Sequence, residues 1–179
     1  MQNILVTGGL GFIGSNLIEL LLSRKFKVIN IDKISYSSNF YNTKSFIKNK
    51  SYRFYKCNLN NHKKLNFILN KYKPVGIFNL AAETHVDRSI DNPGEFISSN
   101  ILGVYNLLEC FKKYVSKNKK SRLIHISTDE VFGDILKGRS NEKFQYKPSS
   151  PYSATKASSD HLVYSYVRTY QIPAIITNC

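Results

Sequence analysis

The stretch ILVTGGLGFIGSNLIELLL, residues 4–22, joins an apolar run, three spaced glycines and an amphipathic segment. The apolar run is short and rich in β-branched residues, which is typical of a buried strand. Gly8 permits a tight turn, Gly11 lets a phosphate approach the backbone, and Gly14 allows the following helix to pack closely on the strand. The pattern therefore predicts a strand, a loop and a helix whose N-terminus binds the pyrophosphate of a dinucleotide. A glycine-rich turn without a ligand is the alternative.

An acidic residue follows the next apolar run at the spacing expected of a ribose-binding carboxylate. Asp32 comes about 20 residues after the glycines. Its charge would accept hydrogen bonds from both ribose hydroxyls and repel a 2′-phosphate, so NAD is favoured over NADP. The neighbouring Lys33 weakens that preference.

Short β-branched runs alternate with longer amphipathic segments along the whole chain. Strands are expected at residues 3–7, 27–32, 52–56, 76–80, 122–127 and 174–177, and helices near 12–24, 63–72, 94–117 and 152–170. One face of the third helix would carry Phe96, Asn100, Val104, Leu107, Leu108 and Phe111. This alternation predicts an α/β fold of the Rossmann type, a doubly wound parallel sheet, with residues 1–179 as one NAD-binding domain. Residues 35–46 are expected to form a polar loop, and residues 133–151 a long excursion that carries function.

The composition argues against a nucleic-acid partner, a membrane span and a disulfide framework. The net charge of +14 resides partly in lysine runs at 62–73 and 111–120. These lysines interleave with apolar residues at helical spacing, which favours solvated helix faces over a nucleic-acid-binding stripe. No run approaches the roughly 20 apolar residues of a membrane span, and the N-terminus enters a strand without room for a signal peptide. The three scattered cysteines indicate a reducing cytoplasm and no disulfide framework.

The chain ends at Cys179, directly after the last expected strand. In an open α/β sheet, ligands bind beyond the carboxyl ends of the strands. We therefore expect a protein truncated before most of a C-terminal substrate domain.

Two pairs of reactive side chains stand out. Asp129 and Glu130 follow an apolar strand, where they form either a solvated loop start or an acid and a base held for chemistry. Tyr152 and Lys156 lie four residues apart, on one face at the start of an expected helix. Pro151 supports this start, because proline is favoured at the first position of a helix. A nearby ammonium and the positive nicotinamide of NAD⁺ would lower the pKa of Tyr152 and make it a base near neutral pH. Taken alone, this spacing is common and mostly without function.

Four motifs together resemble the extended short-chain dehydrogenase/reductases, and among them the dTDP-glucose 4,6-dehydratase family. They are TGGLGFIG (7–14), NLAAETHVDRSI (79–90), ISTDEVFG (126–133) and PYSATKASSDH (151–161). The resemblance runs through the whole chain and covers roughly the N-terminal half of such an enzyme. The acidic pair of the third motif distinguishes the dehydratases from related epimerases, which lack it.

The resemblance implies dehydration of dTDP-glucose on one retained NAD. Tyr152 removes the proton of the sugar 4-hydroxyl as hydride leaves C4, water is eliminated across C5 and C6, and the hydride returns to C6. The family assigns the base at C5 to the position of Glu130 and the acid at the C6 hydroxyl to that of Asp129. Thr128 would bond the 4-hydroxyl, and Lys156 the nicotinamide ribose. Enclosure and mutual repulsion would raise the pKa of one acid of the pair.

The resemblance also assigns residues to binding. The cofactor-binding positions are Gly8, Gly11, Phe12, Ile13, Gly14, Asp32, Lys33, Ile34, Ser35, Asn58, Leu59, Leu80, Ala81, Ala82, Ser99, Tyr152 and Lys156. Thr84, His85 and Thr128 would contact the substrate. Asn58 departs from the usual aspartate, which suggests weaker NAD retention, and Ser99 replaces a threonine. No metal site is expected, because His85 and Asp87 lack a third ligand.

Two other functions remain open: a related NAD-dependent nucleotide-sugar 4-epimerase or decarboxylase, and a non-catalytic NAD-binding module. Family members commonly dimerise through a four-helix bundle. The helices near 94–117 and 152–170 would supply it here.

Overall fold

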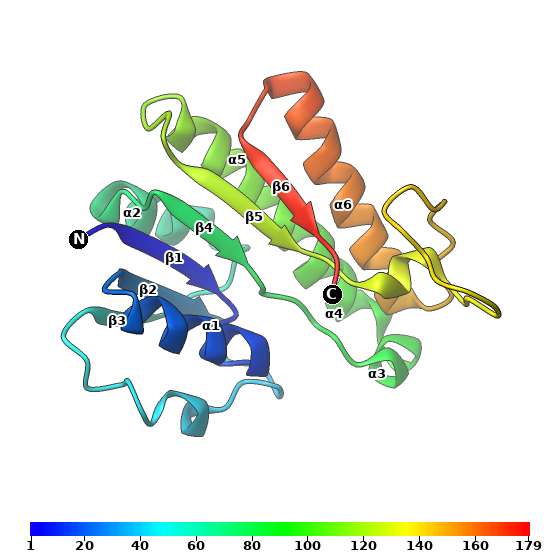
Figure 1. The fold of residues 1–179 in the computed structure, drawn as a ribbon, viewed down its shortest axis with the longest axis horizontal. Coiled ribbons are helices and arrows are strands. Elements are labelled where there is room, and N and C mark those ends of the chain that lie inside the picture. Colours follow the sequence, from blue (N-terminus) through cyan, green and yellow to red (C-terminus); the bar gives the residue numbers. More distant parts are fainter.

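Six parallel strands form one sheet in the computed structural model, which describes residues 1–179 (Figure 1). The strands are β1 (Asn3–Thr7), β2 (Lys27–Asp32), β3 (Tyr52–Lys56), β4 (Gly76–Asn79), β5 (Arg122–Ile126) and β6 (Ala174–Thr177). Their order is β3-β2-β1-β4-β5-β6, with every neighbouring pair parallel. The predicted strands and the doubly wound Rossmann topology are confirmed.

The helices cover both faces of the sheet. They are α1 (Phe12–Ser23), α2 (His62–Tyr72), α3 (Val86–Asp91), α4 (Pro93–Phe96), α5 (Gly103–Val115) and α6 (Pro151–Tyr170). The larger apolar core lies between one face and α2, α5 and α6, whereas a smaller core packs α1 against the other face. Adjacent residues of β1 serve the two cores, Leu5 the larger one and Ile4 the smaller one, because side chains alternate along a strand.

The expected helix at 94–117 is not continuous. It consists of α4, a π-helical segment at Ile97–Leu102 and then α5, and the short helix α3 before it was not predicted. The predicted apolar face is nevertheless correct, since Phe96, Asn100 and Val104 are all buried. An extra residue in a π turn shifts the side chains around the axis, and such turns are frequent at functional sites.

Local sequence signals fix the start of α6. The Ser150 hydroxyl accepts from the Ser153 amide at 3.1 Å, and the Ser153 hydroxyl in turn accepts from the Ser150 amide at 3.0 Å. This capping box and Pro151 at the first helical position set the helix boundary one residue before Tyr152. The preceding segment, residues 133–150, contains no helix or strand, as predicted. No helix of the structure is both long and apolar enough to cross a membrane.

Candidate active site

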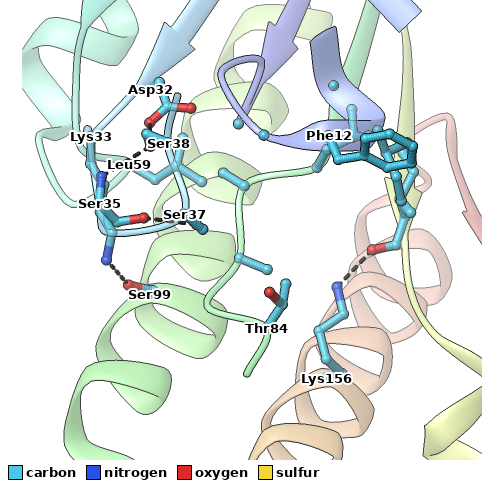
Figure 2. A pocket seen from close by; sticks show the side chains of 18 of the residues that line it. Phe12, Asp32, Lys33, Ser35, Ser37, Ser38, Leu59, Thr84, Ser99 and Lys156 are labelled. Carbon is cyan, nitrogen blue, oxygen red and sulfur yellow. Dashed lines mark hydrogen bonds between the residues drawn. The ribbon is translucent and has the colours of Figure 1, made fainter. Parts of the chain in front are cut away.

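A cleft of about 540 Å³ opens at the carboxyl ends of the strands, where the chain order reverses between β1 and β4 (Figure 2). Its lining includes nearly all of the predicted cofactor positions: Gly8, Gly11, Phe12, Ile13, Gly14, Asp32, Lys33, Ser35, Asn58, Leu59, Leu80, Ala81, Ala82, Ser99, Tyr152 and Lys156. Thr84, His85 and Thr128 also line it. Ile34 does not, and lines a neighbouring pocket instead.

The glycine loop forms one wall of the cleft. Gly8 has φ +71°, and a Cβ there would lie 2.8 Å from backbone atoms of Ala81. A Cβ on Gly14 would lie 2.4 Å from the Gly8 carbonyl oxygen. Gly11 is the N-cap of α1 and supplies no side-chain hydrogen bond to the helix. The first amides of α1 therefore remain available to an anion in the cleft.

Asp32 joins the glycine loop to the loop after β2 at one side of the cleft. Its carboxylate is buried, and accepts hydrogen bonds from the Leu10 amide at 3.1 Å, the Ile34 amide at 2.8 Å and the Ser38 hydroxyl at 2.8 Å. Ile34 adopts a left-handed backbone, φ 62°, as the chain turns around this carboxylate. Asp32 thus holds the glycine loop and the loop after β2 in one fixed arrangement.

Tyr152 and Lys156 lie on one face of α6 beside the end of β5, as predicted. Both side chains are buried. Burial raises the pKa of Tyr152 to about 12, although a hydrogen bond with Thr128 opposes the rise. Burial also lowers the pKa of Lys156 to about 8, and its Nζ donates to the Ile126 carbonyl at 2.6 Å (Figure 2). The pKa of Tyr152 is thus raised in the chain by itself, and the lowering predicted with NAD⁺ bound stays a prediction.

Asp129 and Glu130 form the start of a 3₁₀ turn, Asp129–Phe132, directly after β5. Both are exposed, and neither lines the cleft proper. The hydroxyl of Thr128 accepts from the Glu130 amide at 3.3 Å and caps this turn. Burial and the charge of Asp129 raise the pKa of Glu130, which is the predicted direction. Both carboxylates also contribute to the raised pKa of Tyr152, so the three groups share one electrostatic environment.

The two predicted sugar contacts lie on the segment between β4 and α3. Thr84 is exposed, and Figure 2 shows it on this segment, between the labelled Ser99 and Lys156. His85 is also exposed and packs its ring edge-to-face against Tyr36, with centroids 5.4 Å apart.

The sequence profile of the GDP-mannose 4,6 dehydratase family matches residues 5–179. The chain belongs to this family. It is 43% identical over 189 residues to the dTDP-glucose 4,6-dehydratase of Neisseria meningitidis, covering 100% of this chain and 53% of the relative. A crystal structure of dTDP-glucose 4,6-dehydratase from Bacillus anthracis, in complex with NAD, matches with a TM-score of 0.88 and 39% identity, over 100% of this chain and 55% of that one. The chain thus spans about half the length of the relatives it matches.

Epimerases share the architecture at lower identity. The UDP-glucose 4-epimerase of Thermus thermophilus, solved in complex with NAD, has a TM-score of 0.86 and 29% identity, covering 98% of this chain and 54% of that chain. The fold alone therefore does not separate dehydratase from epimerase in this family.

A buried polar network that the sequence analysis missed supports the floor of this dehydratase-family cleft. The Thr7 hydroxyl donates to Asn79 Oδ1 at 2.6 Å and accepts from the Ala81 amide at 3.0 Å. Asn79 Nδ2 lies 2.9 Å from Nδ1 of His125. The other ring nitrogen of His125, Nε2, lies 3.4 Å from Asp160 Oδ1. Burial lowers the pKa of His125, although the neighbouring Asp160 opposes this shift. The network fixes the ends of β1, β4 and β5 against α6.

A second missed residue is Asn30, which lies within the apolar run of β2. Its side-chain oxygen accepts from the Gly9 amide at 3.1 Å, and its amide donates to the Tyr52 hydroxyl at 2.9 Å. The available signal was a polar amide inside a strand buried on both faces, since such a group needs partners.

Proposed function

We propose that the chain provides the NAD-binding domain and the proton-transfer groups of a dTDP-glucose 4,6-dehydratase. The observation that carries the proposal is the acidic pair, Asp129 and Glu130, placed after β5 in the same electrostatic environment as Tyr152. An enzyme that only oxidises and reduces C4 has no use for two further carboxylates at this point. Elimination of water needs a base and an acid besides the tyrosine.

The cleft fits NAD on its own geometry. The uncapped amides of α1 suit the pyrophosphate, and the buried Asp32 suits the ribose hydroxyls. A Cβ on Gly11 would approach only the Gly8 carbonyl, at 3.3 Å, so the backbone here is open to a ligand. Small residues, Ala81 and Ala82, line the strand end opposite. The chemistry that bound NAD would supply is reversible hydride transfer, away from C4 of the sugar and later to C6.

Tyr152 takes the proton of the 4-hydroxyl. Its raised pKa of about 12 keeps the phenol protonated in the chain by itself, so a cationic neighbour is needed to make it a base. Lys156, with its ammonium four residues along α6, supplies a short proton path and contacts the nicotinamide ribose. The Thr128 hydroxyl, which lines the cleft together with Tyr152, orients the 4-hydroxyl.

Glu130 removes the C5 proton, which the 4-keto group has made acidic, and gives a proton back to C5 when the hydride returns to C6. Its raised pKa makes it a stronger base than an ordinary glutamate. Asp129 gives a proton to the departing C6 hydroxyl, which leaves as water. With three residues per 3₁₀ turn, successive side chains project in directions about 120° apart, so the two carboxylates can address neighbouring carbons of one ring. Thr84 and His85 contact the sugar from the opposite segment.

Incubation of the purified protein with dTDP-glucose tests the proposal. A 4-keto-6-deoxy product, detected by its absorbance in alkali, is expected. Accumulation of a 4-epimer would favour the epimerase. This alternative is supported by the architecture that the chain shares with a UDP-glucose 4-epimerase. NAD binding without turnover would favour a non-catalytic module.

We also propose a homodimer in which α5 and α6 form a four-helix bundle with a second copy. Large apolar side chains are exposed on these helices and on the π-helical segment before them, among them Ile97, Leu102, Tyr105 and Tyr164. Light scattering should give a dimer, and Tyr164→Lys should weaken it, whereas Tyr41→Lys, at an exposed residue outside these helices, should not.

The proposed location is the cytoplasm. Cys57, Cys110 and Cys179 are all free thiols, as a reducing compartment maintains them. Cell fractionation tests this assignment.

A further inference from the structure

Lys33, beside the ribose-binding carboxylate, has its charge engaged elsewhere. Its ammonium donates to the Ser99 hydroxyl at 2.7 Å and forms an ion pair with Glu83 (Figure 2 shows the bond to Ser99). From its place beside Asp32, this lysine was expected to act as a cation that weakens the preference for NAD. In the structure its ammonium is instead bound by Glu83 and Ser99.

Glu83 is an unusual partner because it is buried. Its side chain is 1% exposed, compared with 30% for Lys33. Neither carboxylate oxygen accepts a hydrogen bond, so the ion pair with Lys33 is the interaction that neutralises the charge. A buried carboxylate left without a cation is strongly unfavourable, and therefore holds its lysine firmly.

The backbone of Glu83 is fixed by the π-helical segment. Asn100 accepts from the Glu83 amide at 2.8 Å and donates to the Glu83 carbonyl at 2.9 Å. The preceding residue, Ser99, provides the second contact to Lys33. Two consecutive residues of one segment thus position both members of the ion pair.

The ion pair lies at the adenosine end of the cleft. Lys33 and Ser35 line both the cleft and the neighbouring pocket, into which Glu83 also faces. Two other cations of that pocket are engaged as well. Arg88 stacks on the Tyr36 ring at 3.8 Å, and Lys64 donates to the Lys56 carbonyl at 2.6 Å.

We propose that Glu83 is a specificity-determining residue that excludes NADP by sequestering the ammonium of Lys33. A free cation next to the ribose-binding acid is the feature that accommodates a 2′-phosphate. Glu83 withdraws that cation, and Asp32 then repels the phosphate unopposed. The inference rests on the proposed NAD function and extends it to the choice of cofactor.

Calorimetric titration of purified protein with NAD⁺ and NADP⁺ tests the inference. Glu83→Gln keeps the shape and removes the charge, so NADP⁺ should bind about fivefold more tightly while NAD⁺ affinity is retained. The double variant Glu83→Gln with Lys33→Met should return to the wild-type ratio of affinities. Glu95→Gln, a second acid of the neighbouring pocket, should leave the ratio unchanged. The gain should diminish at higher salt.

If a folded Glu83→Gln protein still binds NAD⁺ and its ratio of NADP⁺ to NAD⁺ affinity is unchanged, the inference is overturned but the proposed function is not. A gain that survives Lys33→Met would overturn it too, because Lys33 would not be its source. If Glu83→Gln does not fold, Glu83→Asp decides: the shorter acid should give a smaller change in the same direction, and no change would refute the inference. Failure of the wild type to bind either dinucleotide would overturn the proposed function and this inference with it.

Discussion

The two sides of the cleft are built in different ways. On the cofactor side, the glycine loop packs backbone against backbone, and Asp32 accepts hydrogen bonds from its own chain. On the catalytic side, Asp129 and Glu130 are exposed on a 3₁₀ turn that a single threonine caps. The proposed binding groups are therefore part of the folded core, whereas this acidic pair, proposed as the acid and base of the elimination, lies outside it. Substitutions on the first side should affect folding, and those on the second side turnover.

The largest effect is expected for Gly14→Ala. Its Cβ would lie 2.4 Å from the Gly8 carbonyl and 2.8 Å from Gly9 Cα, and backbone cannot yield as a side chain does. We expect a loss of about 3 kcal/mol in unfolding free energy, measured by chemical denaturation. The control Gly138→Ala has φ +83° but no neighbour within 4 Å, and should cost about 1 kcal/mol. Equal costs would contradict the close packing of the loop.

Tyr152→Phe should separate turnover from folding. Removing the phenol hydroxyl eliminates the proposed base at the 4-hydroxyl, so dehydration should slow about 10³-fold. The unfolding free energy should change by no more than about 1 kcal/mol. Steady-state assays and denaturation on the same samples provide both values. Turnover within a factor of two of the wild type would exclude Tyr152 as the base.

Glu130→Gln should have a smaller effect of the same kind. Loss of the base at C5 should slow dehydration about 10²-fold, with a stability change below about 0.5 kcal/mol because the residue is exposed. Glu142→Gln, another exposed acid in the segment after the 3₁₀ turn, is the matched control and should be unaffected. A wild-type rate in Glu130→Gln would refute the role assigned to this residue.

Substitution of Lys156 should affect both folding and turnover, because the side chain is buried and is also a proposed catalytic group. Its pKa of about 8 in the folded chain is below the ordinary value of 10.5. Between these two pH values the unfolded chain retains a proton that the folded chain has lost, so stability should rise with pH across the window. The rise should be at most about 3 kcal/mol, and Lys156→Met should lack it. Parallel pH profiles for both proteins would contradict the depressed pKa.

The smallest effect is expected for Asn58→Asp. Asn58 is exposed in the cleft and accepts from the Asn60 amide at 2.9 Å, a bond that aspartate can keep. A charged acceptor binds donors more strongly, so NAD affinity should increase about threefold. Unchanged affinity in calorimetry would show that this position does not contact the cofactor.

Much of the architecture could be predicted because it depends on local patterns. The six strands, α1, α2 and α6 follow from apolar periodicity, and Pro151 marks a helix start that the structure confirms. The π-helical segment could not be predicted, because apolar spacing at 94–117 is compatible with a continuous helix. Within this segment Asn100 makes two hydrogen bonds to the backbone of Glu83, a tertiary contact that apolar spacing does not reveal.

Partners of charged side chains were the other unpredictable feature. From its position next to Asp32, Lys33 was expected to weaken the preference for NAD, whereas in the structure its ammonium pairs with Glu83. The pKa of Tyr152 was predicted from the ammonium of Lys156 and the nicotinamide of bound NAD⁺, whereas burial of the phenol dominates in the chain by itself. Desolvation depends on the whole surrounding fold, which spacing along one helix does not reveal.

Isotope tracing of the hydride tests the central claim most directly. dTDP-glucose deuterated at C4 would be incubated with the purified protein, and the product analysed by mass spectrometry and NMR. We predict a 4-keto-6-deoxy sugar that carries the deuterium at C6. Deuterium recovered at C4 of an epimerised sugar would contradict the account, because Asp129 and Glu130 would then have no elimination to catalyse.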